Sequence, residues 1–443
     1  MKIHILSAAA AALIFAGGAI HGPYLPSPGL TAHAEEESYT DFYPDNSYVL
    51  FHLYSDHAVL AKYDGSETSY TVPDTVEGLP VTEIGDTAFA GVFELTSLVI
   101  PDTVTRIGDD AFNFAFYLEE ITLPSSLEYI GYRAFSLCGV KTLSLPASLK
   151  TIADLTSEKE TFCQSCPALT SITVDSKNPY FSAKDGVLFD KKKTVLYRYP
   201  PAKEGSSYTM PSTVKSISDG AFHKSALESI TVSAKLETVG VRAFGYCESL
   251  SAIELPGSVK SIGGSAFIKC TALEELTLNE GLETIGRGSF SGCSAIKEVT
   301  IPSTVSQISD SAFVTCQSLR TVTIRSKDCV LGSGSEVFSD SSINGYMGST
   351  AQDYAETFQQ RFSLIHDLGD LDGDTRIDSS DASAVLVEYA AIQTGAEPSV
   401  DKSIGDVNGD GYIDSSDASD ILQYYSFTQT GGAATLTEFL EAR

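Results

Sequence analysis

Two short stretches near the C-terminus carry oxygen side chains at the spacing with which a protein loop wraps a hard cation. In both stretches, positions 1, 3, 5, 9 and 12 are Asp or Asn, and position 7 can offer its backbone carbonyl. The ligand sets are Asp370, Asp372, Asp374, Arg376, Asp378 and Asp381, and, 36 residues on, Asp406, Asn408, Asp410, Tyr412, Asp414 and Asp417. This is the ligand spacing of an EF-hand loop, and oxygen ligands with several carboxylates suit Ca²⁺ better than a soft metal. The sequence therefore predicts two calcium sites.

The two loops differ from the EF-hand pattern in ways that bear on affinity. Position 12 is Asp in both loops, where an EF-hand has Glu. Position 6 of the first loop is Thr375, where glycine is preferred for the sharp turn, whereas Gly411 keeps the pattern in the second. We therefore expect weaker binding at the first site. The alternative, two unliganded Asp-rich surface loops, must explain why the whole pattern occurs twice.

Each loop leads into a segment with helical periodicity. Apolar residues recur at i, i+3, i+4 and i+7, which predicts one buried face on each helix. The two faces comprise Ala382, Val385, Leu386 and Tyr389, and Ala418, Ile421, Leu422 and Tyr425. No full helix precedes either loop, so the expected unit is a pair of loop–helix halves.

This duplicated unit, over about residues 366–430, resembles a type I-like dockerin. The resemblance implies Ca²⁺-dependent binding to a cohesin module of a scaffoldin in a cellulosome. The repeated Asp-Ser-Ser-Asp-Ala-Ser (378–383 and 414–419) matches the place where dockerins carry their cohesin-reading pair. By that resemblance the candidate cohesin contacts are Ser379, Ser380, Ser415 and Ser416, and the near-identical halves imply that either helix can dock. The alternative is that these serines only favour the start of a helix.

The charge of the chain excludes several classes of partner. The 443 residues include 58 Asp and Glu but 29 Lys and Arg, a net charge of −29, of which residues 366–443 carry −13. Such acidity argues against binding nucleic acid or an anionic membrane surface, both of which need a basic face. With 42% hydrophobic residues, the chain can still form a packed core.

A period of about 23 residues organises the middle of the chain. An Ala-Phe or Ser-Phe pair recurs at Phe89, Phe112, Phe135, Phe222, Phe244, Phe267, Phe290 and Phe313. Each unit also carries an apolar-x-x-apolar-x-apolar stretch, as at Leu250, Ile253 and Leu255. One coil of this length cannot bury its own apolar face, whereas stacked coils pair their strands and form internal ladders. The units resemble the leucine-rich repeats of the BspA type, which implies a solenoid that mediates adhesion or protein binding.

The expected fold is therefore a β-rich leucine-rich-repeat solenoid followed by a small all-α calcium-binding dockerin domain. The expected divisions are a signal peptide at 1–34, an N-terminal cap at 35–70, the solenoid at 71–345 with a hairpin insertion at 178–211, a C-terminal cap at 346–365, and the dockerin domain at 366–443. Lys2, an Ala-rich apolar run and Ala32-His33-Ala34 support the signal peptide. No later segment is apolar enough to span a membrane, so we expect a secreted protein.

Five of the eight cysteines share one position, three residues after the repeat phenylalanine: Cys138, Cys247, Cys270, Cys293 and Cys316. Small buried thiols that stack between coils account for this position better than disulfides, because a ladder rarely gives the disulfide dihedral. The Cys163-x-x-Cys166 pair lacks a second pair or a nearby His that would complete a metal site.

The repeats contain neither a G-x-S-x-G nor an H-E-x-x-H motif, and Glu119-Glu120 and Glu274-Glu275 lie at outward strand positions. We therefore expect a secreted, non-catalytic interaction or adhesion protein in a polysaccharide-degrading complex, held at the cell surface or in a cellulosome through cohesin. The alternatives are a carbohydrate-active enzyme of unrecognised type and a protease-inhibitor-like regulator. The polar strand face has almost no aromatic residues, which favours a protein or glycoprotein ligand over a flat polysaccharide.

Overall fold

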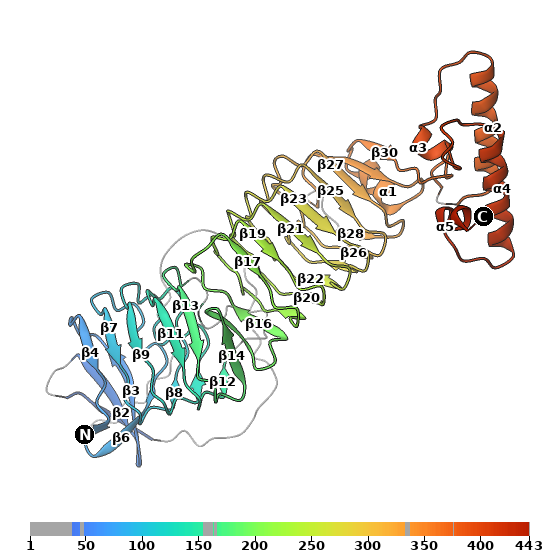
Figure 1. Cartoon of the computed structure of the whole chain (residues 1–443). Coiled ribbons are helices and arrows are strands. Elements are labelled where there is room, and N and C mark those ends of the chain that lie inside the picture. The colour runs from blue at the N-terminus through green and yellow to red at the C-terminus, as the bar shows by residue number, and fades with distance from the viewer. Residues whose placement is uncertain are drawn as a thin grey trace. The chain divides into compact units, whose positions relative to one another are not determined.

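The computed structural model describes residues 38–44, 48–153, 163, 166–332, 337–374 and 376–442. The expected signal peptide and Thr375 lie outside the described residues. Most of the described chain winds into a solenoid of short parallel strands, and a small helical segment follows it (Figure 1). This is the fold expected from the repeats and the paired loops.

The first strands close the N-terminal end of the solenoid as an antiparallel sheet. Strands β1 (Thr40–Phe42), β2 (Val49–Leu53) and β3 (Ala58–Tyr63) pair in sequence order. Strand β3 then pairs in parallel with β6 (Leu79–Ile84), while β5 (Thr75–Val76) forms a small antiparallel pair with β6. The cap thus continues the sheet of the first coil, and the three-residue β1 is the terminal strand of this sheet.

Two rows of parallel strands run along the coils. The longer strands of one row are β4 (Ser69–Thr71), β7 (Ser97–Val99), β9 (Glu120–Thr122), β11 (Thr142–Leu145), β13 (Ser171–Val174), β17 (Ser207–Thr209), β19 (Ser229–Thr231), β21 (Ala252–Leu255), β23 (Glu275–Leu278), β25 (Glu298–Ile301), β27 (Thr321–Ile324), β29 (Ser342–Gly345) and β30 (Phe362–Leu364). The other row consists of two-residue strands: β8 (Arg106–Ile107), β10 (Tyr129–Ile130), β12 (Thr151–Ile152), β18 (Ser216–Ile217), β20 (Thr238–Val239), β22 (Ser261–Ile262), β24 (Thr284–Ile285), β26 (Gln307–Ile308) and β28 (Val330–Leu331). Most coils contribute a strand to each row, and parallel pairing within the rows joins neighbouring coils.

The hairpin expected within the insertion is present. Strand β15 (Val187–Asp190) pairs antiparallel with both β14 (Phe181–Lys184) and β16 (Val195–Arg198), and β16 then pairs in parallel with β18. Asp190 fixes the turn, because its Oδ1 accepts hydrogen bonds from the backbone amides of Thr194 and Val195 at 2.6 and 2.8 Å.

The repeat phenylalanines form a ladder inside the solenoid. From Phe222 to Phe313 the rings of successive coils are stacked, with centroids 4.8–5.1 Å apart, and each ring is almost fully buried. Cysteines lie beside this ladder, where the thiols of Cys247, Cys270, Cys293 and Cys316 each donate to the carbonyl of the ladder phenylalanine one coil earlier, as in Cys270 Sγ to Phe244 O at 3.1 Å. All eight cysteines are buried and unbridged, as expected for the five that share the repeat position.

Helix α1 (Thr350–Thr357) covers the last coils, as its apolar spacing predicted. Ala351, Tyr354 and Ala355 are buried, and the ring of Tyr354 meets Phe338 edge-on at 5.7 Å. The C-terminal segment then folds as α2 (Ser379–Gln393), α3 (Lys402–Gly405), α4 (Ser415–Gln429) and α5 (Leu436–Glu441). Among the described residues, none of the helices has the length and hydrophobicity needed to cross a bilayer.

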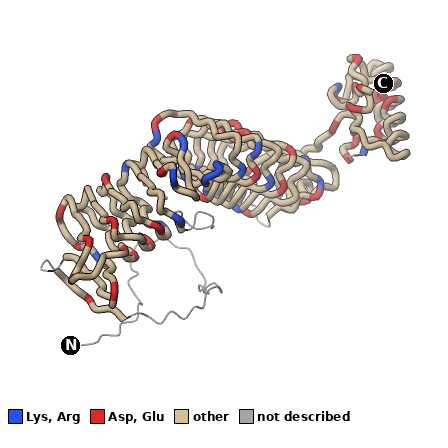
Figure 2. The backbone as a smooth tube through the Cα atoms, turned by 60° about the horizontal axis from the view of Figure 1, so that its bottom comes forward, with Lys and Arg blue, Asp and Glu red and all other residues tan. Residues whose placement is uncertain are grey.

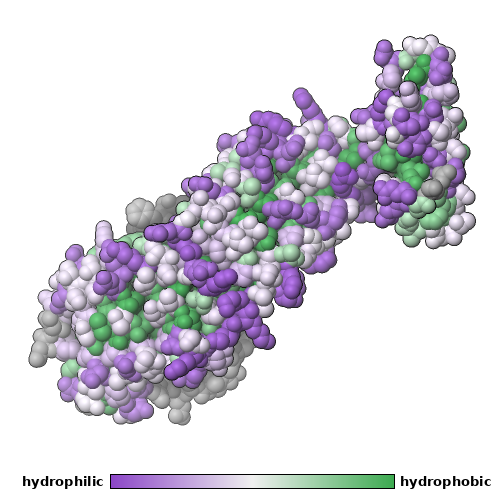
Figure 3. All heavy atoms as spheres, viewed as in Figure 1, coloured by the Kyte–Doolittle hydropathy of each residue, from purple (hydrophilic) through white to green (hydrophobic). Residues whose placement is uncertain are grey.

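The surface reflects the uneven charge of the sequence. Asp and Glu far outnumber Lys and Arg in the C-terminal helical segment, whereas both signs occur along the solenoid (Figure 2). Several solenoid charges pair between neighbouring coils, as in Lys215–Glu237 and Lys260–Glu283. Hydrophobic side chains also reach the surface of the first coils, bordered by hydrophilic ones (Figure 3).

Candidate metal centre and docking helices

Each acidic loop ends by capping the helix that follows it. Asp378 and Asp414 are the N-caps of α2 and α4, and each forms a capping box with the Asp three residues on, Asp381 or Asp417. A capping box satisfies two of the amide groups that a helix start leaves free. Loop positions 9 and 12 therefore hold the end of the loop on the helix.

The second loop is held by hydrogen bonds from its own backbone to its acidic side chains. Oδ1 of Asn408 accepts from the Asp410 amide at 2.9 Å, and Oδ1 of Asp410 accepts from the Tyr412 amide at 2.9 Å. Asp406 Oδ2 accepts from the Gly411 amide at 2.8 Å, while its Oδ1 is buried and accepts no hydrogen bond from any residue that the structure describes. A buried carboxylate oxygen without a donor is costly unless a cation lies beside it. The residues present thus fit a bound Ca²⁺.

The first loop repeats two of these hydrogen bonds. Oδ1 of Asp372 accepts from the Asp374 amide at 3.1 Å, and Oδ1 of Asp374 accepts from the Arg376 amide at 2.7 Å. Asp370 is 1% exposed. One carboxylate oxygen from each of Asp370, Asp372 and Asp374 can be chosen so that all three lie within 4.8 Å of one another. The structure therefore brings together positions 1, 3 and 5 of this loop.

The position-12 carboxylates lie beneath the loops. Oδ1 of Asp381 accepts from the Leu371 amide at 2.7 Å, and Oδ1 of Asp417 accepts from the Val407 amide at 2.8 Å. Burial raises the pKa of both carboxyl groups, although these amide donors oppose the shift. Both residues are 0% exposed, so they join each loop to its helix from below.

The pKa values of the position-9 carboxyl groups are shifted the opposite way. The Ser380 hydroxyl donates to Asp378 at 2.6 Å and the Ser416 hydroxyl donates to Asp414 at 2.6 Å. These side-chain hydrogen bonds hold the pKa of both carboxyl groups below the usual value. Both groups are therefore ionised at neutral pH, as a calcium ligand must be.

The glycines of the loops confirm the sharp turns that their spacing predicts. Gly373 and Gly409, at position 4 of each loop, both have φ of 74°, and Gly411 at position 6 has φ of 91°. Backbone of this kind favours glycine over residues with a Cβ. The first loop has Thr375 at position 6, which is outside the described residues.

Helices α2 and α4 pack on each other around a small core. The buried apolar residues are Ala382, Val385, Val407, Ile413, Ala418, Ile421 and Leu436. The prediction that Leu386 and Leu422 lie on the buried face is wrong: each is 44% exposed. Glu388 takes an inward place on α2 instead, because its carboxylate accepts hydrogen bonds from the Ser399 amide and hydroxyl, each at 2.5 Å.

The exposed residues of the two helices match by position. Ser379 and Ser380 begin α2, Ser415 and Ser416 begin α4, and all four are exposed. Leu386 and Leu422 lie at the same distance from the first Asp of their loops, and Val387 beside Leu386 is 71% exposed. Each helix therefore presents serines at its start and an apolar side chain two turns on. Only the serines were singled out from the sequence, and the shared offset of the leucines is the signal that could have added them.

The two serines of each pair differ in their bonding. Ser380 and Ser416 use their hydroxyls to hold Asp378 and Asp414, whereas Ser379 and Ser415 have no side-chain hydrogen bond within the described part of the chain. The alternative interpretation, that the serines serve the helix start, therefore fits the second serine of each pair.

Comparison with known families assigns both parts of the chain. The profile of the BspA type leucine-rich repeat region matches residues 82–184 and 204–344 in six copies. The chain belongs to the BspA-type leucine-rich repeat family. The profile of the dockerin type I domain matches residues 368–425, which span both acidic loops and most of α4. The leucine-rich repeat solenoid thus carries a C-terminal dockerin, which implies a cohesin partner in a cellulosome-like complex.

Solved structures agree on the fold of the solenoid. A leucine-rich repeat protein from Eubacterium ventriosum is 24% identical, with a TM-score of 0.53, over 69% of this chain and 95% of that one. The pneumococcal vaccine antigen PcpA is 22% identical, with a TM-score of 0.52, over 74% of this chain and 99% of that one. No curated protein matches the chain.

Proposed function

We propose that this BspA-type protein is exported, binds cohesin through its dockerin in a Ca²⁺-dependent way, and places its repeats as a non-catalytic binding surface in a polysaccharide-degrading complex. The duplication of the loop–helix unit carries this proposal. Matching hydrogen bonds, glycine conformations and exposed side chains occur in both halves. If the two acidic loops bound no cation, nothing would require the same geometry in both of them or a buried carboxylate oxygen at Asp406.

The proposed calcium ligands are the twelve residues at positions 1, 3, 5, 7, 9 and 12 of the two loops. Bound Ca²⁺ would supply positive charge that allows several carboxylates to lie close together. The protein itself fixes the start of each helix and so positions the exposed serines and leucines. Metal binding is thereby coupled to the shape of the docking surface.

The proposed cohesin contacts are Ser379, Ser380, Ser415 and Ser416, and we add Leu386 and Leu422 because their side chains are exposed on the same helices. An exposed apolar side chain surrounded by polar ones is typical of the centre of a protein interface. Since both helices present the same set, either of them can serve as the main docking element.

The outward glutamates of the solenoid strands support a non-catalytic role. A glycosidase needs one carboxyl group with a raised pKa. Burial raises the pKa of Glu83, but that carboxyl is held in an ion pair with Arg106 at 3.0 Å. Lys297 hydrogen-bonds Glu274 and lowers the pKa of that carboxyl, and Glu119 forms an ion pair with Lys141 at 2.5 Å. His223 is buried, and burial lowers its pKa to about 3, so it is a poor general base at neutral pH.

Substitutions on the two helices test the docking part of this proposal. We expect Leu386→Asp or Leu422→Asp alone to weaken binding to a type I cohesin only slightly, because the other helix remains. The combined variant should bind at least about 100-fold more weakly, since charge is then placed in both apolar centres. Glu397→Gln, an exposed change outside the loops, is the matched control. Full affinity in the combined variant would rule out these helices as the cohesin surface.

A second experiment separates the proposed role from the two alternatives. The full chain is incubated with plant polysaccharides and, separately, with proteases while product release is followed. We expect neither turnover of polysaccharide nor inhibition of proteolysis. Sustained release of sugars would establish an enzyme, and stoichiometric protease inhibition would establish a regulator.

A further inference from the structure

Four aromatic side chains stand exposed on the first coils of the solenoid. Phe93, Phe114, Phe116 and Tyr117 are 56%, 44%, 44% and 59% exposed. The rings of Phe93 and Phe116 lie 6.2 Å apart with an interplanar angle of 16°, and Phe114 meets Phe116 edge-on at 5.9 Å. We refer to these four residues as the aromatic patch.

The fold does not require these rings. Phe93 and Phe116 occupy one repeat position, four residues after the ladder phenylalanine. In the other coils this position holds Gly139, Ala226, Glu248, Thr271, Ser294 and Gln317. Small or polar residues thus serve the solenoid equally well, and exposed aromatic rings gain little from folding. Their clustering on neighbouring coils indicates a role in binding.

The backbone holds the aromatic patch in place. The Phe114 amide donates to Ser136 O at 3.1 Å, and the Phe116 amide donates to Phe114 O at 2.9 Å. The next coil packs so closely that a Cβ at Gly139 would lie 2.1 Å from the Phe116 carbonyl oxygen. Rings on such a backbone lose little freedom when a ligand binds, which favours affinity.

The size of the aromatic patch favours a small or linear ligand. An aromatic side chain offers roughly 200 Å², so four rings about half exposed present roughly 400 Å². A stable protein–protein interface needs about 800 Å² on each partner. The aromatic patch is therefore too small for a typical protein partner, but it can stack against a few ring-shaped units of a linear ligand.

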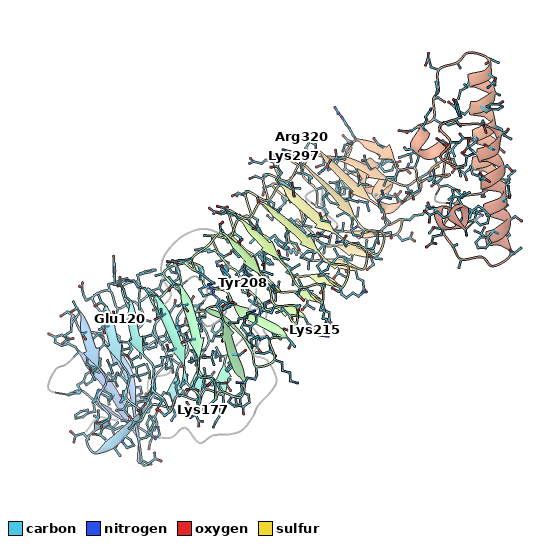
Figure 4. All side chains as sticks on the ribbon, in the orientation of Figure 1. Glu120, Lys177, Tyr208, Lys215, Lys297 and Arg320 are labelled. Atoms are coloured by element: carbon cyan, nitrogen blue, oxygen red, sulfur yellow. The ribbon has the colours of Figure 1, made fainter. Side chains whose placement is uncertain are left out.

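The charges around the aromatic patch narrow the chemistry of that ligand. Residues 93–120 include six Asp or Glu and one Arg, so anionic polymers are disfavoured. Glu94, Glu119 and Glu120 are exposed, and Figure 4 labels Glu120, which lies on β9 beside the patch in sequence. Carboxylates accept hydrogen bonds from hydroxyl groups, and aromatic faces pack on apolar C–H surfaces. A pyranose ring offers both kinds of group.

We propose that the aromatic patch binds a neutral polysaccharide by stacking sugar rings on Phe93, Phe116 and Tyr117. This inference rests on the proposed function, since it names the ligand class of the repeats that the dockerin brings into the complex. It also revises the expectation from the strand face, where aromatic residues are rare. The exposed rings lie in the turns instead, which follow the ladder phenylalanines.

The repeats themselves supply substitutions that test the proposal. Phe93→Ser and Phe116→Gln introduce residues that Ser294 and Gln317 already place at this position, so the solenoid should fold. Ser294→Ala with Gln317→Ala is the matched control on later coils. The full-length proteins are run on native gels that contain hydroxyethylcellulose, galactomannan or arabinoxylan, and on a gel that contains polygalacturonate.

We expect at least one neutral polymer to retard the wild-type protein and the control, and the patch variant to bind it at least about tenfold more weakly. Polygalacturonate should retard none of them. Equal retardation of the patch variant, no retardation by any neutral polymer, or retardation by polygalacturonate alone would each overturn the proposal. Cohesin binding is measured on the same proteins. If the wild type binds the neutral polymer but no cohesin, only the docking proposal is refuted. If it binds cohesin but no neutral polymer, only the glycan site is refuted.

Discussion

Removal of Ca²⁺ should unfold the C-terminal helices while the solenoid stays folded. The dockerin core has seven buried apolar residues, two of which are alanines. A core of this size in a segment under 80 residues supplies no more than about 3–5 kcal/mol. A site filled at a hundred times its dissociation constant adds about 2.7 kcal/mol, so two sites contribute as much as the whole core. Without the metal, the carboxylates around Asp406 also repel one another.

The structure gives the size of the expected signal. Helices α2 to α5 hold 40 of the 48 helical residues in the described part of the chain, and α1 holds the other eight. Excess chelator should therefore remove about four-fifths of the helical circular dichroism, and added Ca²⁺ should restore it. Fluorescence cannot follow this transition through tryptophan, since the chain has none. The strand signal and the thermal transition of the solenoid should not change.

Loop variants sharpen this experiment. Asp370→Ala and Asp406→Ala should each raise the Ca²⁺ concentration needed for half-maximal helix formation, whereas Glu397→Gln should leave it unchanged. Helical signal that persists in chelator at full strength would refute the reasoning, because it would show that the small core folds without metal.

Three further outcomes follow from the solenoid. Phe267→Ala should lower the free energy of unfolding by about 3–5 kcal/mol in urea titrations, because its buried ring stacks on two neighbours; a loss below 1 kcal/mol would contradict the ladder. The pKa of His223 is lowered to about 3 in the folded chain, whereas the ordinary value is 6.5. Between these two pH values the unfolded chain binds the proton and the folded chain does not, so the free energy of unfolding falls as the pH falls. Between pH 7 and pH 4 the wild type should lose about 3 kcal/mol more than His223→Gln, and equal losses would refute this. The eight cysteines of the reduced protein should react with a thiol reagent only after unfolding, whereas fast labelling of the native protein would contradict their burial.

The solenoid could be predicted in detail because its signals are periodic. The recurring phenylalanines fix the spacing of the coils, and the alternation in Ile253 and Leu255 places one side of each strand inside. Each unit contacts only its neighbours, so one unit defines the packing of the rest. The shared cysteine position gave buried thiols for the same reason.

The sequence was less informative where two patterns overlap. Leu386 and Leu422 fit the helical periodicity of a buried face, yet the structure exposes them and buries Glu388, whose partner Ser399 lies eleven residues away. Periodicity cannot reveal a partner supplied by a distant loop. The strand positions do not indicate the aromatic patch, because Phe93 and Phe116 lie in the turns.

The acidic loops could be recognised because all the expected ligands of each loop lie within twelve residues. Local spacing is then enough to place Asp370, Asp372 and Asp374 around one point. The sequence does not show which carboxylate oxygens accept from backbone amides, as Asp406 Oδ2 does, and which are buried without a donor among the described residues, as its Oδ1 is. That division depends on the folded loop.

The capture of the full-length protein on an immobilised type I cohesin, with Ca²⁺ and with excess chelator, tests the account most directly. We predict tight binding in Ca²⁺, loss of binding in chelator, and recovery when Ca²⁺ is restored, because the metal shapes the loops that position Ser379, Ser415 and the exposed leucines. Binding that is equally tight in chelator would contradict the account, and so would the absence of binding in saturating Ca²⁺ across cohesins of this type.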